Sequence, residues 1–273
     1  MCVDIAYKLS SDTATIRKSI HGVRISASLE NAEVNAHVQA HARPLMRIIR
    51  PDSSGTPEMT EMRWGLVTPY LLRSADNFKK YGNHLYNARS ENLLDPASTW
   101  FRLRQNRGLL VCAGVYEHQR VEGMKNKQAW FIRPEKEEVF FLPVIYDQSA
   151  LDTTLQDFIT NSGDKQRIEV LHRMMNATTG ELYGSAALLT RKANTMMASI
   201  HNDGPNKHRM PLFLNNDQAR QWLDADLKQE NIRQLIDTQI DDDALRAWPV
   251  PSIRSPKSRP DGKMKHEAMR LSL

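Results

Sequence analysis

The sequence predicts a single α+β domain that spans residues 1–273. Short apolar runs rich in β-branched and aromatic residues dominate the middle of the chain, and polar segments separate them. Helical patterns flank these runs without alternating regularly with them, which favours α+β over a doubly wound sheet. No clear linker divides the chain, and its length is sufficient to enclose one sizeable core.

Six runs are expected to form strands because they combine apolar residues with partial period-two alternation. They span residues 22–29, 46–50, 108–118, 128–132, 138–146 and 185–190. No internal repeat or low-complexity tract interrupts this pattern.

Two later segments have helical spacing. In the first, the apolar residues at i, i+3, i+4 and i+7 are Ala193, Met196, Met197 and Ile200. Thr190 is the expected cap of this helix. The second helix begins near Asn216–Asp217, and its apolar face comprises Ala219, Trp222, Leu223 and Leu227.

The segment that follows, residues 248–263, is rich in proline and basic side chains. This composition is typical of a disordered tail, but it equally fits an extended segment packed on the body of the domain. In the second case, which we expect for residues 249–263, Arg254, Lys257 and Arg259 would face a phosphate backbone.

Composition excludes several classes of protein. The only cysteines are Cys2 and Cys112, with no CxxC or matching His pair, so we expect neither structural disulfides nor a bound metal. No apolar run is long enough to cross a bilayer, and the N-terminal residues lack the pattern of a secretory signal. We therefore expect a cytoplasmic protein. The 37 basic and 32 acidic residues give a net charge of +5, which is compatible with nucleic acid as a partner and is also common on ordinary solvated surfaces.

Cys2 is the first candidate for chemistry. Its side chain is small, so removal of Met1 would leave a free α-amine beside a thiol. The amine has an ordinary pKa of about 7.7–8.0, so part of it is neutral at cellular pH and can condense with an aldehyde to a Schiff base. The thiolate can then add to the imine carbon and close a thiazolidine ring. A cysteine at position two also occurs by chance.

Three further segments carry polar residues beside apolar ones. In residues 86–91, YNARSE, an extended backbone would project Asn87, Arg89 and Glu91 to one face. Glu117 ends an apolar run, where partial desolvation raises a carboxyl pKa and suits it to general acid catalysis. His201 follows the first helix, and a histidine there can be a proton shuttle, a cap or a core residue.

Taken in order along the chain, these motifs resemble the SRAP family, the SOS response-associated peptidases, also called abasic site processing proteins. The matching segments are MC at the start, RWGLV (63–67), NARSE (87–91), GVYEH (114–118), IHN…RMP (200–211) and IRSP (253–256). The resemblance spans nearly the whole chain, and NARSE and RMP are its most specific parts.

The resemblance implies one SRAP domain with a curved, barrel-like antiparallel sheet, flanking helices and a groove for single-stranded DNA. It implies that Cys2 bonds covalently to the open-chain aldehyde of an abasic site. Asn87 would hold the N-terminal segment and the sugar, Glu117 would assist ring opening and Schiff-base formation, and His201 would complete proton transfer. It also implies self-removal of Met1 and a weak lyase activity. No cofactor is implied, and we expect a monomer whose partner is abasic single-stranded DNA.

The candidate DNA contacts are Arg89, Trp64, Arg209 and Arg254. Trp64 is expected either to stack on a base or to lie in the core. Further arginines of a backbone-tracking face are Arg43, Arg47, Arg50, Arg102, Arg104 and Arg107.

The sequence departs from the family pattern near three of these motifs. The common start MCGR is MCVD here, so Asp4 replaces a basic residue, and the common YEW is YEH, with His118 after Glu117. A longer loop before Arg209 adds a second histidine, His208. We favour His201 for the catalytic role because it closes a helix.

Two other functions remain open from the residues alone. The first is a cysteine peptidase that acts on other proteins through Cys2, His201 and Asn87. The second is a module that binds single-stranded DNA non-covalently through its basic and aromatic residues.

Overall fold

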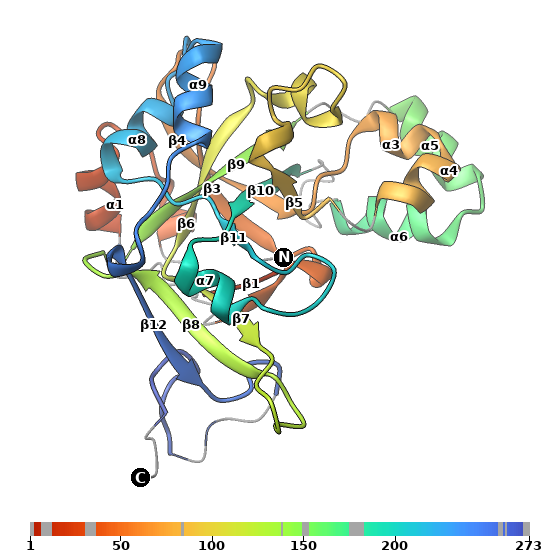
Figure 1. Cartoon of the computed structure of the whole chain (residues 1–273). Helices are drawn as coiled ribbons and strands as arrows, with labels where there is room; N and C mark the ends of the chain where they lie inside the picture. The colour runs from red at the N-terminus through yellow and green to blue at the C-terminus, as the bar shows by residue number, and fades with distance from the viewer. Residues whose placement is uncertain are drawn as a thin grey trace.

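Two β-sheets with helices around them make up the fold (Figure 1). The computed structural model describes residues 3–6, 13–30, 37–82, 85–137, 139–148, 153–174, 183–255, 259 and 261–269. Within these residues strands and helices mix without βαβ alternation, which confirms the expected α+β class. Cys2 lies outside the described residues.

The first sheet closes on itself into a ring of five strands. They follow the order β4 (Pro57–Trp64), β3 (Leu45–Pro51), β6 (Arg107–Cys112), β9 (Phe140–Asp147) and β10 (Gly184–Lys192). β10 then pairs with β4 and closes the ring. Because that last pairing is short, the sheet is ring-like rather than a regular barrel.

Strand β10 carries two short strands beyond the ring. β5 (Asn87–Arg89) continues the β4 edge of β10, and β11 (Arg209–Pro211) continues the β9 edge. The pairings of β10 with β4 and with β5 are parallel, whereas the other pairings in this sheet are antiparallel. The expectation of an antiparallel sheet is therefore correct except along this edge.

The second sheet is antiparallel throughout the described residues. Its strands follow the order β12 (Leu245–Val250), β8 (Gln128–Pro134), β7 (Gly114–Gln119), β1 (Asp4–Ala6) and β2 (Val38–Gln39). β1 lies between β7 and β2, so the start of the described chain is an interior strand.

One continuous segment links the two sheets. The expected strand 108–118 is divided at Ala113 into β6, which belongs to the ring, and β7, which belongs to the second sheet. Gly114 begins β7 where the ring of Phe131 crosses it, and a Cβ atom there would lie 2.0 Å from Phe131 Cζ. Only glycine leaves room for this close approach.

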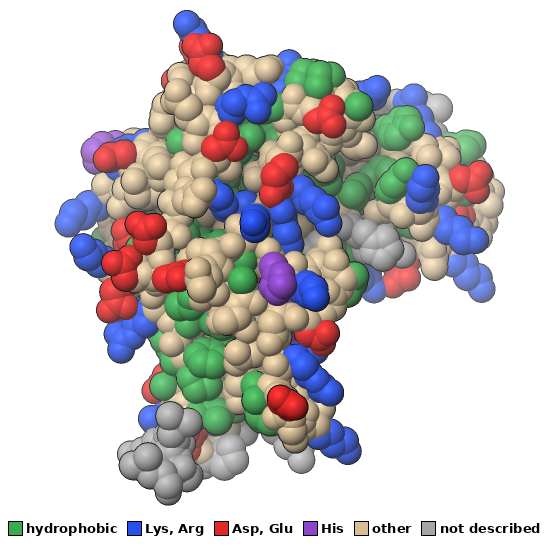
Figure 2. Space-filling model, in the orientation of Figure 1, with side chains coloured by type: hydrophobic (Ala, Val, Ile, Leu, Met, Phe, Trp, Pro, Cys, Tyr) green, Lys and Arg blue, Asp and Glu red, His purple; other side chains and the backbone are tan. Residues whose placement is uncertain are grey.

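Nine α-helices lie within the described residues. They are α1 (Thr13–Ser19), α2 (Ala27–Glu30), α3 (Pro69–Arg73), α4 (Ala75–Asn77), α5 (Thr153–Asn161), α6 (Lys165–Met174), α7 (Thr195–Ile200), α8 (Asn216–Trp222) and α9 (Gln229–Ile236). None of them is long and apolar enough to cross a membrane. Helices α3 to α6 form a lobe at the right of the view, around a small core of their own (Figures 1 and 2).

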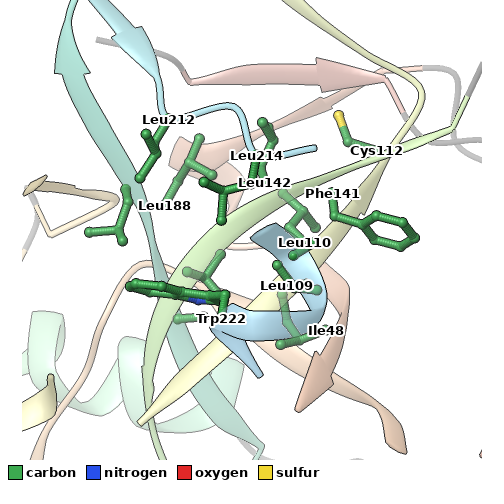
Figure 3. Packing of buried hydrophobic residues seen from close by; sticks show 14 of the residues in the cluster. Ile48, Leu109, Leu110, Cys112, Phe141, Leu142, Leu188, Leu212, Leu214 and Trp222 are labelled. Atoms are coloured by element: carbon green, nitrogen blue, oxygen red, sulfur yellow. The ribbon is translucent and has the colours of Figure 1, made fainter. Parts of the chain in front are cut away.

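The large core fills the ring and the space beneath the flanking helices (Figure 3). Trp222 of α8 is fully buried against the ring, and its Nε1 donates a hydrogen bond to the Gly108 carbonyl over 3.0 Å. Burial of apolar side chains here supplies about 25 cal/mol per Å² of surface removed from water, which holds the helices onto the ring.

Several expected elements are corrected. Residues 22–29 are not a strand: Arg24 makes one isolated bridge to Glu58, and the chain then enters α2. Thr190 lies inside β10, and α7 is capped instead by Asn194, whose side chain accepts from the Met197 amide. Residues 248–250, at the start of the proline-rich segment, are extended and complete β12 against β8.

Replacing Gly114 with alanine is expected to lower the free energy of unfolding by about 1–3 kcal/mol, because the new methyl group overlaps the Phe131 ring. Urea denaturation measures this. Gly184→Ala is the matched control, since its nearest neighbour is the flexible Gln148 side chain at 2.8 Å. Equal stability of both variants would contradict the assigned packing.

Candidate functional site

The start of the described chain lies beside the end of β7. β1 pairs antiparallel with β7, with Asp4 opposite Tyr116 and Ala6 opposite Gly114. The same register, continued by one residue, places Val3 opposite Glu117. The Val3 carbonyl accepts a hydrogen bond of 2.8 Å from the Ala40 amide, which fixes this end of β1. The residue bonded to Cys2 is thus held across from Glu117.

Glu117 is a buried carboxyl group, only 4% exposed. Within the described residues its Oε1 has no hydrogen-bond partner. Burial raises the pKa of Glu117 to about 7, and the nearby negative charge of Asp4 adds to this effect. Protonated and ionised forms are therefore both populated near neutral pH, which suits this group to proton transfer.

His201 caps the C-terminal end of α7 and is 6% exposed. Its Nδ1 lies 2.8 Å from the Arg209 carbonyl, which can only accept, so Nδ1 carries the hydrogen and Nε2 is the acceptor nitrogen of the neutral ring. Burial lowers the pKa of His201 to about 4. An unperturbed histidine titrates near neutral pH, whereas burial keeps the imidazole of His201 neutral there.

His208, the alternative histidine, lies exposed in the loop before β11 with a left-handed backbone of φ 60°. Its amide donates to the His201 carbonyl over 2.8 Å. The helix that ends at His201 packs against β7, where Gln119 Nε2 donates to the Ser199 carbonyl over 3.0 Å. These contacts place His201, rather than His208, on an element fixed to the strand of Glu117.

Asn87 and Arg89 come from β5, the short strand beside β10. Asn87 is buried at 8% exposed, whereas Arg89 is exposed and its Nη2 lies 3.5 Å from Asn206 Oδ1. The extended stretch ends at Arg89, because Ser90–Asn92 is a 3₁₀ turn. The expectation that Glu91 shares one extended face with Asn87 and Arg89 is therefore wrong.

Arg209 contacts several of the polar segments described above. Its guanidinium binds both carboxylate oxygens of Glu91, over 2.5 and 2.8 Å, and donates to the Thr190 carbonyl over 2.7 Å. Although burial opposes ionisation, the bond from Arg209 lowers the pKa of Glu91. Because the Arg209 carbonyl also holds His201, this residue connects the turn after β5, β10, β11 and the end of α7.

Lysine and arginine side chains gather over β5, β10 and β11 (Figure 2). The exposed and half-buried members on these strands are Arg89, Arg191, Lys192 and Arg209, and Lys207 is exposed in the loop before β11. We call this group the basic face.

Three of the other arginines considered from the sequence are not part of a surface. Arg43, Arg47 and Arg107 are each at most 5% exposed. Arg107 Nε, for example, donates to the Trp222 carbonyl over 3.1 Å. These three therefore stabilise the interior and offer no free guanidinium to a phosphate.

Trp64 is also internal. It is 0% exposed, and its Nε1 donates to the Tyr86 carbonyl over 3.0 Å. Its ring has no open face on which a base could stack, so the core alternative applies to this residue.

The thiol of the second cysteine, Cys112, is unreactive. Cys112 is 1% exposed, and burial raises the pKa of its thiol to about 12. A thiol of that kind has almost no thiolate at neutral pH, so it is a poor nucleophile.

One cluster of charged residues was not predicted from the sequence. Asp4 is 1% exposed and binds His37 Nε2 over 2.7 Å and Arg254 Nη2 over 2.8 Å. Arg254, considered earlier as a DNA contact, is thus already paired, although half of its side chain is exposed. The one available signal was a lone aspartate within the apolar start VDIA.

The family model described as SOS response associated peptidase (SRAP) matches residues 1–253. The chain belongs to the SRAP family. This confirms the resemblance drawn from the motifs.

The chain is also similar to curated relatives and, in fold, to a solved structure. The chain is similar to abasic site processing protein YoqW of Bacillus subtilis (strain 168), with 23% identity over 220 residues and 80% of each chain covered. It is similar to abasic site processing protein HMCES of Mus musculus, with 28% identity over 174 residues, 60% of this chain and 44% of that one. A crystal structure of a protein from Bacteroides thetaiotaomicron superposes with a TM-score of 0.72 at 19% identity, covering 98% and 100% of the two chains.

The buried carboxyl of Glu117 makes stability depend on pH. Its ordinary pKa is 4.5 and its folded pKa is about 7, so the folded state holds the proton more tightly. The contribution of this carboxyl to the free energy of unfolding is fully present below pH 4.5 and is lost as the pH rises through 7. The free energy of unfolding changes by about 3 kcal/mol over this range. Glu117→Gln should therefore gain stability relative to the native protein between pH 5 and pH 8, measured by urea denaturation. The exposed Glu122→Gln is the control, and a parallel response of both variants would refute the assignment.

Proposed function

We propose that this chain captures abasic sites in single-stranded DNA through a covalent bond to Cys2, after removal of Met1. Membership of the SRAP family supports this proposal, as do the printed names of its relatives, which are abasic site processing proteins. The observation that carries it furthest is the buried carboxyl of Glu117, which lies across from the residue bonded to Cys2.

The proposed bond formation has two steps. The α-amine of Cys2 attacks the aldehyde carbon of the open-chain sugar, and loss of water gives a Schiff base. The Cys2 sulfur then bonds to the imine carbon while the nitrogen takes up the thiol proton. The product is a five-membered thiazolidine, and the net reaction releases one water molecule.

Glu117 and His201 have different parts in this scheme because burial moves their pKa values in opposite directions. Protonated Glu117, with its pKa near 7, donates a proton as the sugar ring opens and as water leaves. Neutral His201 offers Nε2 as an acceptor, in a ring orientation fixed by the Arg209 carbonyl. Asn87, buried on β5, binds the sugar or the N-terminal segment.

The basic face supplies the surface for the DNA backbone. Arg89 is exposed at the end of β5 and is the best placed of the predicted arginines to meet a phosphate. Arg209 contributes mainly by holding Glu91 and His201, since its side chain is 14% exposed. Removal of Met1 by hydrolysis and a weak lyase reaction from the Schiff base are part of the same proposal.

A cysteine peptidase that cleaves other proteins fits the site less well. Such enzymes pair a thiolate with a protonated imidazole. The pKa of His201 is about 4 because the ring is buried, so it is neutral at the pH where that pair is needed. Blocking the α-amine separates the two functions, because only capture of an aldehyde requires it.

Cys2→Ala is expected to abolish a heat-stable crosslink to single-stranded DNA that carries one abasic site, because amine and thiol must act together. The crosslink is scored by denaturing gel electrophoresis, and intact mass should show that the active protein has lost Met1. Cys112→Ser is the control and should retain the crosslink, since that thiol is buried. A crosslink in a protein that fully retains Met1 would rule out the thiazolidine.

His201→Ala is expected to slow crosslinking by about 10²–10⁴-fold, the usual range for a proton-transfer group. His208→Ala, on the exposed loop, should have a much smaller effect. Because His201 stays neutral across the neutral range, its loss should leave the pH dependence near pH 7 in place, whereas Glu117→Gln should remove it. If folded His208→Ala is the slower variant, the role passes to His208.

A further inference from the structure

Asp4 is an ionisable residue in the interior of the second sheet. It is the first residue of β1, a strand of only three residues between β7 and β2. Its carboxylate is 1% exposed and accepts from His37 Nε2 over 2.7 Å and from Arg254 Nη2 over 2.8 Å. A buried carboxylate of this kind is costly unless it is paired, so both partners are needed for β1 to occupy this place.

The side chains of β1 divide between two faces of the sheet. Ile5 belongs to the large core, whereas Ala6 packs with Tyr116, Val250 and Ile253 on the opposite face. Asp4 alternates with Ile5 and therefore lies on the side of Ala6, away from Glu117. The ion pair of Asp4 therefore holds β1 from the face of the sheet opposite to Glu117. It does not occupy the space beside the Glu117 carboxyl.

Arg254 reaches Asp4 from a segment that is itself fastened to the body. Lys265 Nζ donates to the carbonyls of Ile253 and Ser255 over 3.0 and 2.9 Å, on either side of Arg254. Ile253 is buried at 1% exposed. The guanidinium that meets Asp4 is therefore anchored by its own neighbours in the chain.

We propose that Asp4, His37 and Arg254 are positioning residues that clamp strand β1 against β7 and so set the place of Cys2 relative to Glu117. This inference rests on the proposed function and concerns the same site. Positioning matters because displacement of a reacting group by about 1 Å can cost about 10²-fold in rate. A three-residue strand has few backbone bonds with which to resist such a displacement.

The charges of the clamp also act on Glu117. Asp4 raises the pKa of Glu117, after the larger effect of burial, and Arg254 lowers it. The other titratable groups around Asp4 are Tyr116 and His118 of β7, and burial raises the pKa of Tyr116 and lowers the pKa of His118. The two arms of the ion pair thus have opposite electrostatic effects on Glu117 but the same mechanical effect on β1.

The test compares Asp4→Asn, Arg254→Gln and the double variant in the full chain, with single-stranded DNA that carries one abasic site. Each single variant is expected to slow crosslinking at saturating DNA by about 10-fold to 10²-fold. The double variant should be no slower than the slower single variant, to within about twofold, because both changes break one contact. Affinity for undamaged single-stranded DNA should stay unchanged in all three.

The pH profile of the rate separates positioning from a general loss of structure. The decline in rate as Glu117 ionises should move to lower pH in Asp4→Asn and to higher pH in Arg254→Gln. A merely destabilised protein would not shift its profile in opposite directions. Arg24→Gln is the matched control, since it breaks a pair with Asp52 in which the arginine is 59% exposed, and it should change neither rate nor profile.

Hydrogen exchange of the β1 amides gives a readout that does not depend on DNA chemistry. Asp4→Asn and Arg254→Gln should both speed exchange in β1, whereas Arg24→Gln should not. If the native protein forms no crosslink, the proposed function is wrong. Hydrogen exchange then still tests whether the ion pair holds β1 in place. If Arg254→Gln instead weakens DNA binding, flattens its salt dependence and adds fully to Asp4→Asn, Arg254 is a phosphate contact and the clamp is overturned.

Discussion

Strand β10 is the constraint on which the rest of the structure depends, because it has a neighbour along both edges for most of its length. β4 and then β5 occupy one edge, while β9 and then β11 occupy the other. Its six central residues, 185–190, are buried. Such a strand needs apolar side chains on both faces, and the run SAALLT supplies small and aliphatic residues throughout. The ring closes through β10, and the two segments that carry Asn87 and Arg209 are aligned by it.

Burial then sets the chemistry that the site can perform. A carboxyl and an imidazole are both withdrawn from water, and in each case the charged form is disfavoured. For Glu117 this raises the pKa to about 7, and for His201 it lowers the pKa to about 4. At neutral pH the site therefore holds a carboxyl that can give up a proton and an imidazole that can accept one. The same physical cause produces complementary partners.

Local sequence patterns predicted much of this site. The apolar run before Glu117 indicated a desolvated carboxyl, and its pKa is raised by burial as expected. The helical spacing of Met197 and Ile200 located the helix that ends at His201. Strands β9 and β10 were predicted from continuous apolar runs.

Features that depend on long-range contacts could not be predicted in this way. Trp64 has the same local sequence whether it faces a base or the core, and its burial follows from long-range packing within the large core. The pKa of His201 depends on how deeply tertiary packing buries the ring, which spacing does not reveal. The run 22–29 alternates like a strand, but within the described residues it makes only one isolated bridge, from Arg24 to Glu58.

The pairing of Asp4 with Arg254 joins residues 250 positions apart, and this has a consequence for the order in which the protein acquires its shape during synthesis. The ribosome makes a chain from its N-terminus at about 5–20 residues per second. Residues 4–6 therefore emerge long before β7, which supplies their hydrogen bonds, and longer still before Arg254. In a nascent chain, residues 4–6 are thus exposed while the opposing carboxyl and the basic partner are still unmade. Residues 4–6 are thus made early relative to their partners but reach their final surroundings late.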